Sequence, residues 1–127
     1  MFKKKIKKSH FVPSGLMAKT EKGFFYVKND KRFKVISDRA LKTWKLQIVH
    51  TTEQYMKNVK IVGIVGFRDG SLIKDISNNK VYFISNNQKL HITSPDVIKL
   101  LGYKKDDIIL VSAKEAAVHK EGVPLNG

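Results

Sequence analysis

Residues 70–101, GSLIKDISNNKVYFISNNQKLHITSPDVIKLL, decide the fold because they predict a β-hairpin followed by a helix. An aromatic-rich apolar run at 81–84 is separated by a short polar turn from an alternating segment at 89–93. In that segment Leu90 and Ile92 are two residues apart, which is the spacing of a half-buried strand. The pattern therefore predicts two antiparallel strands with one apolar face.

The residues at the ends of these elements support the same interpretation. Asn86 and Asn87 tolerate the left-handed φ that a tight hairpin turn needs. Ser94 is a natural N-cap, and Pro95 would occupy the first helical position, where its missing N–H costs nothing. Gly102 can end the helix.

A second segment of the chain resembles this one. Residues 15–44, GLMAKTEKGFFYVKNDKRFKVISDRALKTW, also start with Gly and place a lysine four residues later, Lys19 against Lys74. An aromatic run, a polar turn, an alternating strand and a serine, Ser37, follow in the same order. A repeat of this kind predicts two structural units of similar design.

The likeness continues beyond the two helices. Residues 48–53 (IVHTTE) resemble residues 110–115 (LVSAKE), whereas the apolar run at 59–67 has no counterpart in the second segment. That run either links the units or adds a strand to a shared sheet, and it favours one continuous body. The predicted class is α+β, with two tandem β-hairpin-plus-short-helix units and a basic extended N-terminal arm. The predicted organisation is a basic arm at 1–14, a first repeat unit at 15–58, an apolar linker or strand at 59–69 and a second repeat unit at 70–127.

The C-terminal part carries two further local signals. Asp106 and Asp107 precede a buried-looking strand and are interpreted as a turn and a cap rather than as paired catalytic carboxylates. Ser112 is placed to cap a short final helix, with Glu115 completing a capping box.

Apolar residues on one face of the predicted strands and helices are expected to form the core. These are Phe25, Phe33, Val35, Leu41, Trp44, Tyr82, Ile84, Leu90, Ile92, Ile98 and Leu101.

The formal charge of +14 is concentrated in the first half of the chain. Residues 1–63 hold 16 Lys and Arg against 4 Asp and Glu, and residues 64–127 hold 9 against 7. Such asymmetry indicates that one end meets an anionic partner. The alternative explanation of the positive charge is a compositional bias from an AT-rich coding sequence, because lysine far outnumbers arginine. The candidate contacts of the arm are Phe2, Lys3, Lys4, Lys5, Lys7, Lys8 and Phe11.

A second candidate basic surface lies on the first hairpin. Its members are Lys28, Lys31, Arg32 and Lys34. The neighbouring rings of Phe24, Phe25, Tyr26 and Phe33 could form a platform for stacking single-stranded bases, but alternate rings filling the core is the favoured interpretation. Gly63 and Gly66 formally match a phosphate-clamping GxxG loop, yet their apolar surroundings predict bending or close packing.

Several classes of function are disfavoured by what the sequence holds. Cysteine is absent, which excludes disulfides and thiol chemistry. No apolar run approaches the roughly 20 residues that span a bilayer, and we expect no membrane partner. The histidines, His10, His50, His91 and His119, lack the spacing of a metal site. We therefore expect no enzyme activity, no metal and no cofactor.

The second segment resembles a small module found in bacterial cell-surface and cell-wall-associated proteins and in phage virion proteins. The motifs that carry the resemblance are DGSLIK at 69–74, VYFI at 81–84, TSPDV at 93–97, LGY at 101–103, DIILVS at 107–112 and EGVPL at 121–125. The resemblance implies a binding or structural module, often in tandem, without catalytic residues. The first segment matches only in outline, because Asp38 replaces the proline and the Leu-Gly-Tyr step is missing.

Three functions follow as expectations. The first is a phage virion structural protein, in the capsid, neck or tail, that contacts other virion proteins in many copies and is assembled in the host cytoplasm. The second is nucleic-acid binding by the basic front half, including packaged DNA. The third is binding of cell-wall glycans through the second hairpin, at Asn86, Asn87, Gln88 and His91.

Overall fold

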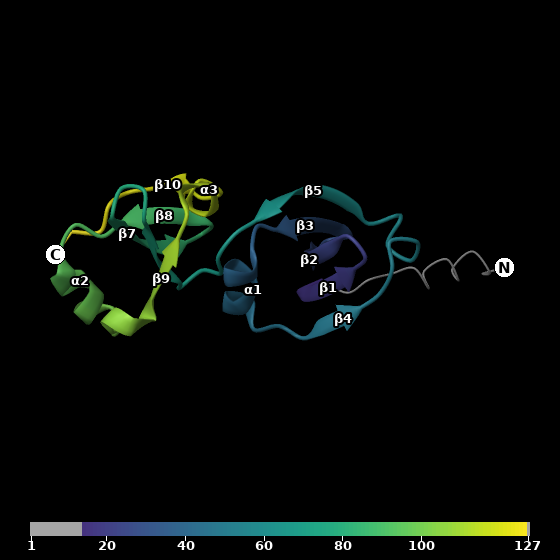
Figure 1. Cartoon of the computed structure of the whole chain (residues 1–127), viewed down its shortest axis with the longest axis horizontal. Helices are drawn as coiled ribbons and strands as arrows, with labels where there is room; N and C mark the ends of the chain where they lie inside the picture. Colours follow the sequence, from purple (N-terminus) through teal and green to yellow (C-terminus); the bar gives the residue numbers. More distant parts are fainter. Residues whose placement is uncertain (1–13, 127) are drawn as a thin grey trace. The chain divides into compact units, whose positions relative to one another are not determined.

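The computed structural model describes residues 14–126 and shows a mixed α/β chain that is mostly β (Figure 1). The described strands form two five-stranded mixed sheets, and three short α-helices accompany them. The two halves of the chain do not share one sheet, which was one of the two alternatives for the apolar run at 59–67. The predicted arm lies outside the described residues, apart from Ser14.

The first sheet is built from a three-stranded meander with a parallel strand at each edge. The meander consists of β1 (Leu16–Thr20), β2 (Gly23–Lys28) and β3 (Lys31–Val35), and the edges are β4 (Ile48–His50) and β5 (Lys60–Val65). The strand order is β4-β1-β2-β3-β5. The apolar run after Asn58 thus provides an edge strand.

The second sheet repeats this arrangement. Its meander consists of β6 (Leu72–Asp75), β7 (Lys80–Ser85) and β8 (Gln88–His91), and its parallel edges are β9 (Ile108–Val111) and β10 (Lys120–Glu121). The order is β10-β8-β7-β6-β9, which is the first order read from the other edge. The short strand β10 is therefore the counterpart of β5, although the sequence suggested that β5 had none.

The strand registers correct the predicted alignment of the two segments. Met17 of β1 pairs with Ile48, and the corresponding Leu72 of β6 pairs with Ile108. Ile48 thus corresponds to Ile108, not to Leu110, so the predicted likeness of 48–53 to 110–115 is two residues out of register. Glu115 and Glu53 consequently occupy different positions in the two halves.

Each helix lies between two strands in the chain order. They are α1 (Asp38–Trp44), α2 (Pro95–Leu100) and α3 (Ala113–Ala116), with a 3-10 helix, η2 (Lys105–Asp107), before β9. Although α1 follows the first hairpin, it groups with the second sheet. The described residues up to Val35, with Lys45–Val65, form one compact body, and Ile36–Trp44 with the residues from Gly66 onwards form the other.

The predicted hairpin turns are confirmed. Asn29 and Asp30 have φ of 51° and 62°, and Asn86 and Asn87 have φ of 51° and 63°. Two consecutive left-handed residues match the twist of the flanking strands. Short Asn and Asp side chains are the L-residues that accept this conformation most readily.

The predicted helix ends are confirmed as well. The hydroxyl of Ser94 accepts a hydrogen bond from the Asp96 N–H, with Pro95 at the first helical position. Gly102, with φ of 84°, follows the end of α2. Ser112 and Glu115 form the reciprocal capping box at the start of α3.

Each body has its own apolar core. In the first, Ala18, Val27, Met56 and Val59 pack together. In the second, a cluster formed by Leu72, Ile92 and Val97 is extended by half-buried neighbours such as Phe83.

The residues expected in the core divide into three groups. Phe25, Val35, Tyr82, Ile84 and Ile92 are buried, and Phe33, Leu41, Trp44, Leu90 and Ile98 are half-buried. Leu101 differs from the expectation, because it is 39% exposed. It is the C-cap of α2, where the helix ends and the chain turns at Gly102.

Gly66 is a site of close packing. A Cβ built there would lie 2.5 Å from His119 Nε2, and hydrogen bonds at both ring nitrogens hold the imidazole in place. We predict that Gly66→Ala lowers the free energy of unfolding of the second body by about 1–3 kcal/mol, because a buried ring must move. Chemical denaturation followed by Trp44 fluorescence measures this, since the indole N–H donates to the Gly66 carbonyl.

Gly63→Ala is the matched control. Its Cβ would meet Phe33 Cδ2 at 3.4 Å, an ordinary contact, and we expect a change below about 1 kcal/mol by circular dichroism. Equal losses in the two variants would contradict the packing argument.

Candidate functional site

Only part of the candidate basic surface on the first hairpin is exposed to solvent. Lys28 and Lys31 are exposed, whereas Lys34 is half-buried and donates to the Lys22 carbonyl. Arg32 departs from the expectation, because it is buried, with 4% of its surface exposed. Its guanidinium carbon lies 4.6 Å from the centroid of the Phe25 ring.

Arg32 is buried because Glu53 neutralises it. Its Nη1 and Nη2 donate to the two carboxylate oxygens of Glu53, each at 2.7 Å, and its Nε donates to the Val59 carbonyl at 2.8 Å. The Thr20 hydroxyl donates to the same carboxylate at 2.5 Å. A planar guanidinium matches a carboxylate in this bidentate geometry, which a lysine cannot reproduce.

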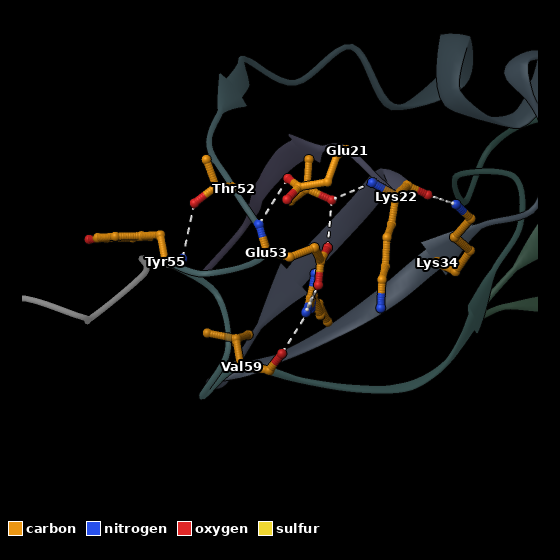
Figure 2. A network of polar contacts seen from close by, with 9 residues as sticks. Glu21, Lys22, Lys34, Thr52, Glu53, Tyr55 and Val59 are labelled. Atoms are coloured by element: carbon orange, nitrogen blue, oxygen red, sulfur yellow. Dashed lines mark hydrogen bonds and ion pairs between the residues drawn. The ribbon is translucent and has the colours of Figure 1, made fainter.

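The pair lies in a wider polar network that fastens the loop after β4 to the sheet (Figure 2). Glu21 accepts a hydrogen bond from the Glu53 N–H at 3.0 Å, and Thr52 accepts one from the Tyr55 N–H at 3.1 Å. Hydrogen bonding from Arg32, against the opposing effect of burial, lowers the pKa of Glu53 to about 2. We assign this network a structural role.

Sequence reasoning did not select Glu53. The only available signal was its isolation, since it is the one acidic residue between Asp38 and Asp69 in a lysine-rich chain.

The second body contains a comparable ion pair whose buried member is a carboxylate, Glu115. Arg39 of α1 donates to both of its oxygens, at 2.8 and 3.1 Å, and the Ser37 hydroxyl donates at 2.5 Å. Burial alone would raise the pKa of Glu115, but hydrogen bonds from Arg39, Ser112 and Ser37 hold it at about 2. Glu115 thus joins α1 to α3 in addition to closing the capping box.

His119 is the most buried of the described histidines and is fully engaged. Its Nε2 accepts a hydrogen bond from the Phe67 N–H at 3.0 Å, and its Nδ1 lies 2.9 Å from the Asn87 carbonyl oxygen. Burial lowers the pKa of the imidazole. The neutral ring, with its proton on Nδ1, satisfies both contacts.

A row of lysines crosses one end of the first sheet. In the strand registers Lys28 is opposite Lys31, and Lys31 is opposite Lys60; all three are exposed. The Ser14 hydroxyl accepts a hydrogen bond from the Asn29 N–H at 2.8 Å, in the turn between Lys28 and Lys31. Ser14, the first described residue, therefore lies beside this row. Like charges on neighbouring strands repel, so an anion placed there would be stabilising.

The other residues that the sequence singled out provide weaker support for a functional site. Asp107 accepts a hydrogen bond from the Lys104 N–H at 2.8 Å, which confirms its capping role. In the proposed glycan surface, His91 is half-buried, with its ring centroid 5.7 Å from that of Tyr82. Within residues 14–126 no three His, Cys, Asp or Glu side chains gather as a metal site would require. No helix in the same range is long and apolar enough to cross a membrane.

Comparison with protein-family models, with curated proteins and with solved structures found no match.

We predict that Glu53→Gln lowers the free energy of unfolding of the first body by about 1–3 kcal/mol at pH 7, because the buried Arg32 loses its counter-charge. The folded pKa of about 2 lies below the ordinary 4.5, so this stabilisation is complete above about pH 4.5 and is lost as the pH falls towards 2. The difference between the two proteins should therefore shrink over that range. Urea unfolding followed by NMR intensities of the β1–β3 amides measures it.

Glu121→Gln removes an exposed carboxylate and serves as the control, with an expected change within about 0.5 kcal/mol. Wild-type stability in the Glu53→Gln variant at pH 7 would contradict the assigned role of the pair.

Proposed function

We propose that this chain is a non-enzymatic phage virion structural protein, a capsid, neck or tail component that holds other virion proteins in contact. The observation that supports a protein-binding role most directly is the exposed apolar edge strand β5. Residence in a virion is suggested by the resemblance of residues 69–125 to modules of phage particles and bacterial surfaces.

Strand β5 is suited to pairing with another chain. It hydrogen-bonds to β3 along one side, and its other side has no strand beside it among the described residues. Ile61, Val62 and Ile64 are 47%, 47% and 54% exposed. Soluble proteins usually protect such an edge with charges, prolines or a covering segment. An exposed apolar edge offers backbone hydrogen bonds and side-chain contacts to an added strand.

We interpret the two sheets as copies of one hairpin-plus-helix module in tandem. Their equal strand order supports this interpretation. A second support is a shared contact: Arg32 lies 4.6 Å from the Phe25 ring centroid, and Lys89, in the matching position of β8, lies 5.1 Å from that of Tyr82. Duplicated binding modules are common where a protein contacts several neighbours.

The test replaces the apolar edge by charge. We predict that Val62→Lys with Ile64→Lys reduces incorporation into particles by roughly 30-fold, since loss of an interface anchor costs about 2 kcal/mol or more. Particles released by cells that express the protein are purified, and its copy number is measured by quantitative mass spectrometry. The control is Leu100→Lys, at an exposed position of α2, and this variant should incorporate normally.

Two results would contradict this proposal. Absence of the wild-type protein from purified particles would exclude a virion role. Normal incorporation of the folded β5 variant would exclude β5 as the contact.

The lysine row favours a second candidate function, the binding of nucleic acid. Lys28, Lys31 and Lys60 lie side by side, and Ser14 is hydrogen-bonded in the turn between the first two. In the sequence, five of the first eight residues are lysines as well. Lysines that neutralise phosphates release counterions, which makes affinity depend steeply on salt. A virion protein that faces packaged DNA would combine both functions.

For this second candidate, we predict that replacing Lys28, Lys31 and Lys60 by Glu weakens duplex-DNA binding and reduces the slope of log affinity against log salt by roughly 3. Fluorescence anisotropy across a salt series measures both quantities. The control replaces three exposed lysines of the second body, Lys80, Lys114 and Lys120, by Glu. An equal loss in both variants would indicate general attraction to a basic protein, and a wild-type affinity insensitive to salt would exclude the function.

A further inference from the structure

The second body contains a cavity of about 620 Å³ between α2, η2 and one face of the second sheet. Its volume lies within the usual range of binding pockets, about 300–1,000 Å³. Apolar side chains form most of its surface, namely those of Val81, Pro95, Ile98, Tyr103 and Ile108.

The apolar part of the cavity is held in place by the fold. The Tyr103 hydroxyl donates to the Gly70 carbonyl at 2.6 Å, and its ring centroid lies 6.2 Å from that of Phe83. The Tyr103 N–H also donates to the Ile98 carbonyl, which fixes the end of α2. The cavity therefore exists before any ligand arrives, and binding needs little reorganisation.

The first sheet shows why the second has room here. In β6 and β7 Lys74 is paired with Val81, and in β1 and β2 the matching pair is Lys19 with Phe24. The ammonium of Lys19 lies 5.6 Å from the centroid of the Phe24 ring. Valine is smaller than phenylalanine, so the second sheet leaves more room at this position.

Positive charge surrounds the apolar surface. Four of the nine lining residues are lysines, at positions 74, 99, 104 and 105, and none is acidic. The carboxylate of the neighbouring Asp107 already accepts a hydrogen bond from the Lys104 N–H. The lysine-rich N-terminal segment of this chain is consequently an unsuitable occupant, because like charges would meet.

We propose that this cavity binds an acidic segment of a partner protein, with an aromatic or large aliphatic side chain in the cavity and Asp or Glu residues on the lysines around it. A single small anion would need fewer cations. Lysines on flexible stems, carried by a strand, a helix and the following turn, suit several carboxylates spread along a peptide. The cavity lies in the second body, so this proposal is independent of the role of β5.

The probe is a synthetic peptide of about ten residues in which a central tryptophan is flanked by glutamates on both sides. Titration into the full chain, followed by NMR, is expected to give saturable shifts at the amides of Val81, Ile98 and Ile108. Peptides with Gln in place of Glu, or Ser in place of Trp, should bind at least about tenfold more weakly.

Two variants test the site in different ways. Val81→Phe narrows the apolar part of the cavity but keeps its charges, and replacement of Lys99, Lys104 and Lys105 by Glu keeps the cavity but reverses most of its charges. Each is expected to weaken binding at least about tenfold. The variant with Glu at Lys80, Lys114 and Lys120 should bind like the wild type, and NMR spectra establish that each variant is folded.

Other outcomes would overturn the proposal. These are no saturation by about 1 mM peptide, shifts that map elsewhere, or binding unaffected by both cavity variants. Saturation of the cavity by decanoate but not by the peptide would overturn it in favour of a small amphiphilic anion.

Discussion

A buried charge requires an opposite charge and hydrogen-bond partners beside it, and each compact body contains one ion pair with a buried member. In the first body the buried Arg32 of β3 pairs with Glu53 in the loop after β4. In the second body the buried Glu115 pairs with Arg39 of α1 and accepts a hydrogen bond from Ser37, which precedes α1. In each body the pair fastens a segment that follows a parallel edge strand. Since an unpaired buried charge is far costlier than an exposed one, these pairs restrict which packing the chain can adopt.

The use of acidic residues inside the fold also shapes the outer surface. The chain has 11 Asp and Glu against 25 Lys and Arg. Glu53, Glu115 and the buried Asp75 serve internal contacts, with Asp75 accepting hydrogen bonds from the backbone and hydroxyl of Ser77. Two of the three arginines that the structure describes are also used in ion pairs, whereas many lysines remain exposed. What a partner meets is therefore mainly lysine, a compact and strongly hydrated charge that favours anionic surfaces without demanding one geometry.

Local features of the fold could be predicted from the sequence because their causes are local. The Asn-rich turns, the Ser94-Pro95 cap and the capping box at Ser112 each depend on residues within a few positions of one another. Arg32 was misplaced because alternation along a strand does not show that a partner 21 residues away will neutralise an inward charge. The register between the halves was misjudged because two similar hexapeptides, 48–53 and 110–115, matched in composition while parallel pairing to β1 and β6 fixed a different alignment. The cavity beside α2 was not predicted, since it depends on the size of Val81 relative to surfaces distant in sequence.

The membership of α1 in the second body limits how this chain can be cut and recombined. The chain passes from one body to the other after Val35, after Trp44 and after Val65. No single break point separates the two bodies, because a fragment starting at Gly66 would leave Glu115 buried without Arg39 and Ser37. A fragment cut at Gly66 would therefore be an incomplete unit, and any recombination of the two bodies would have to keep α1 with the C-terminal sheet rather than with the hairpin that precedes it.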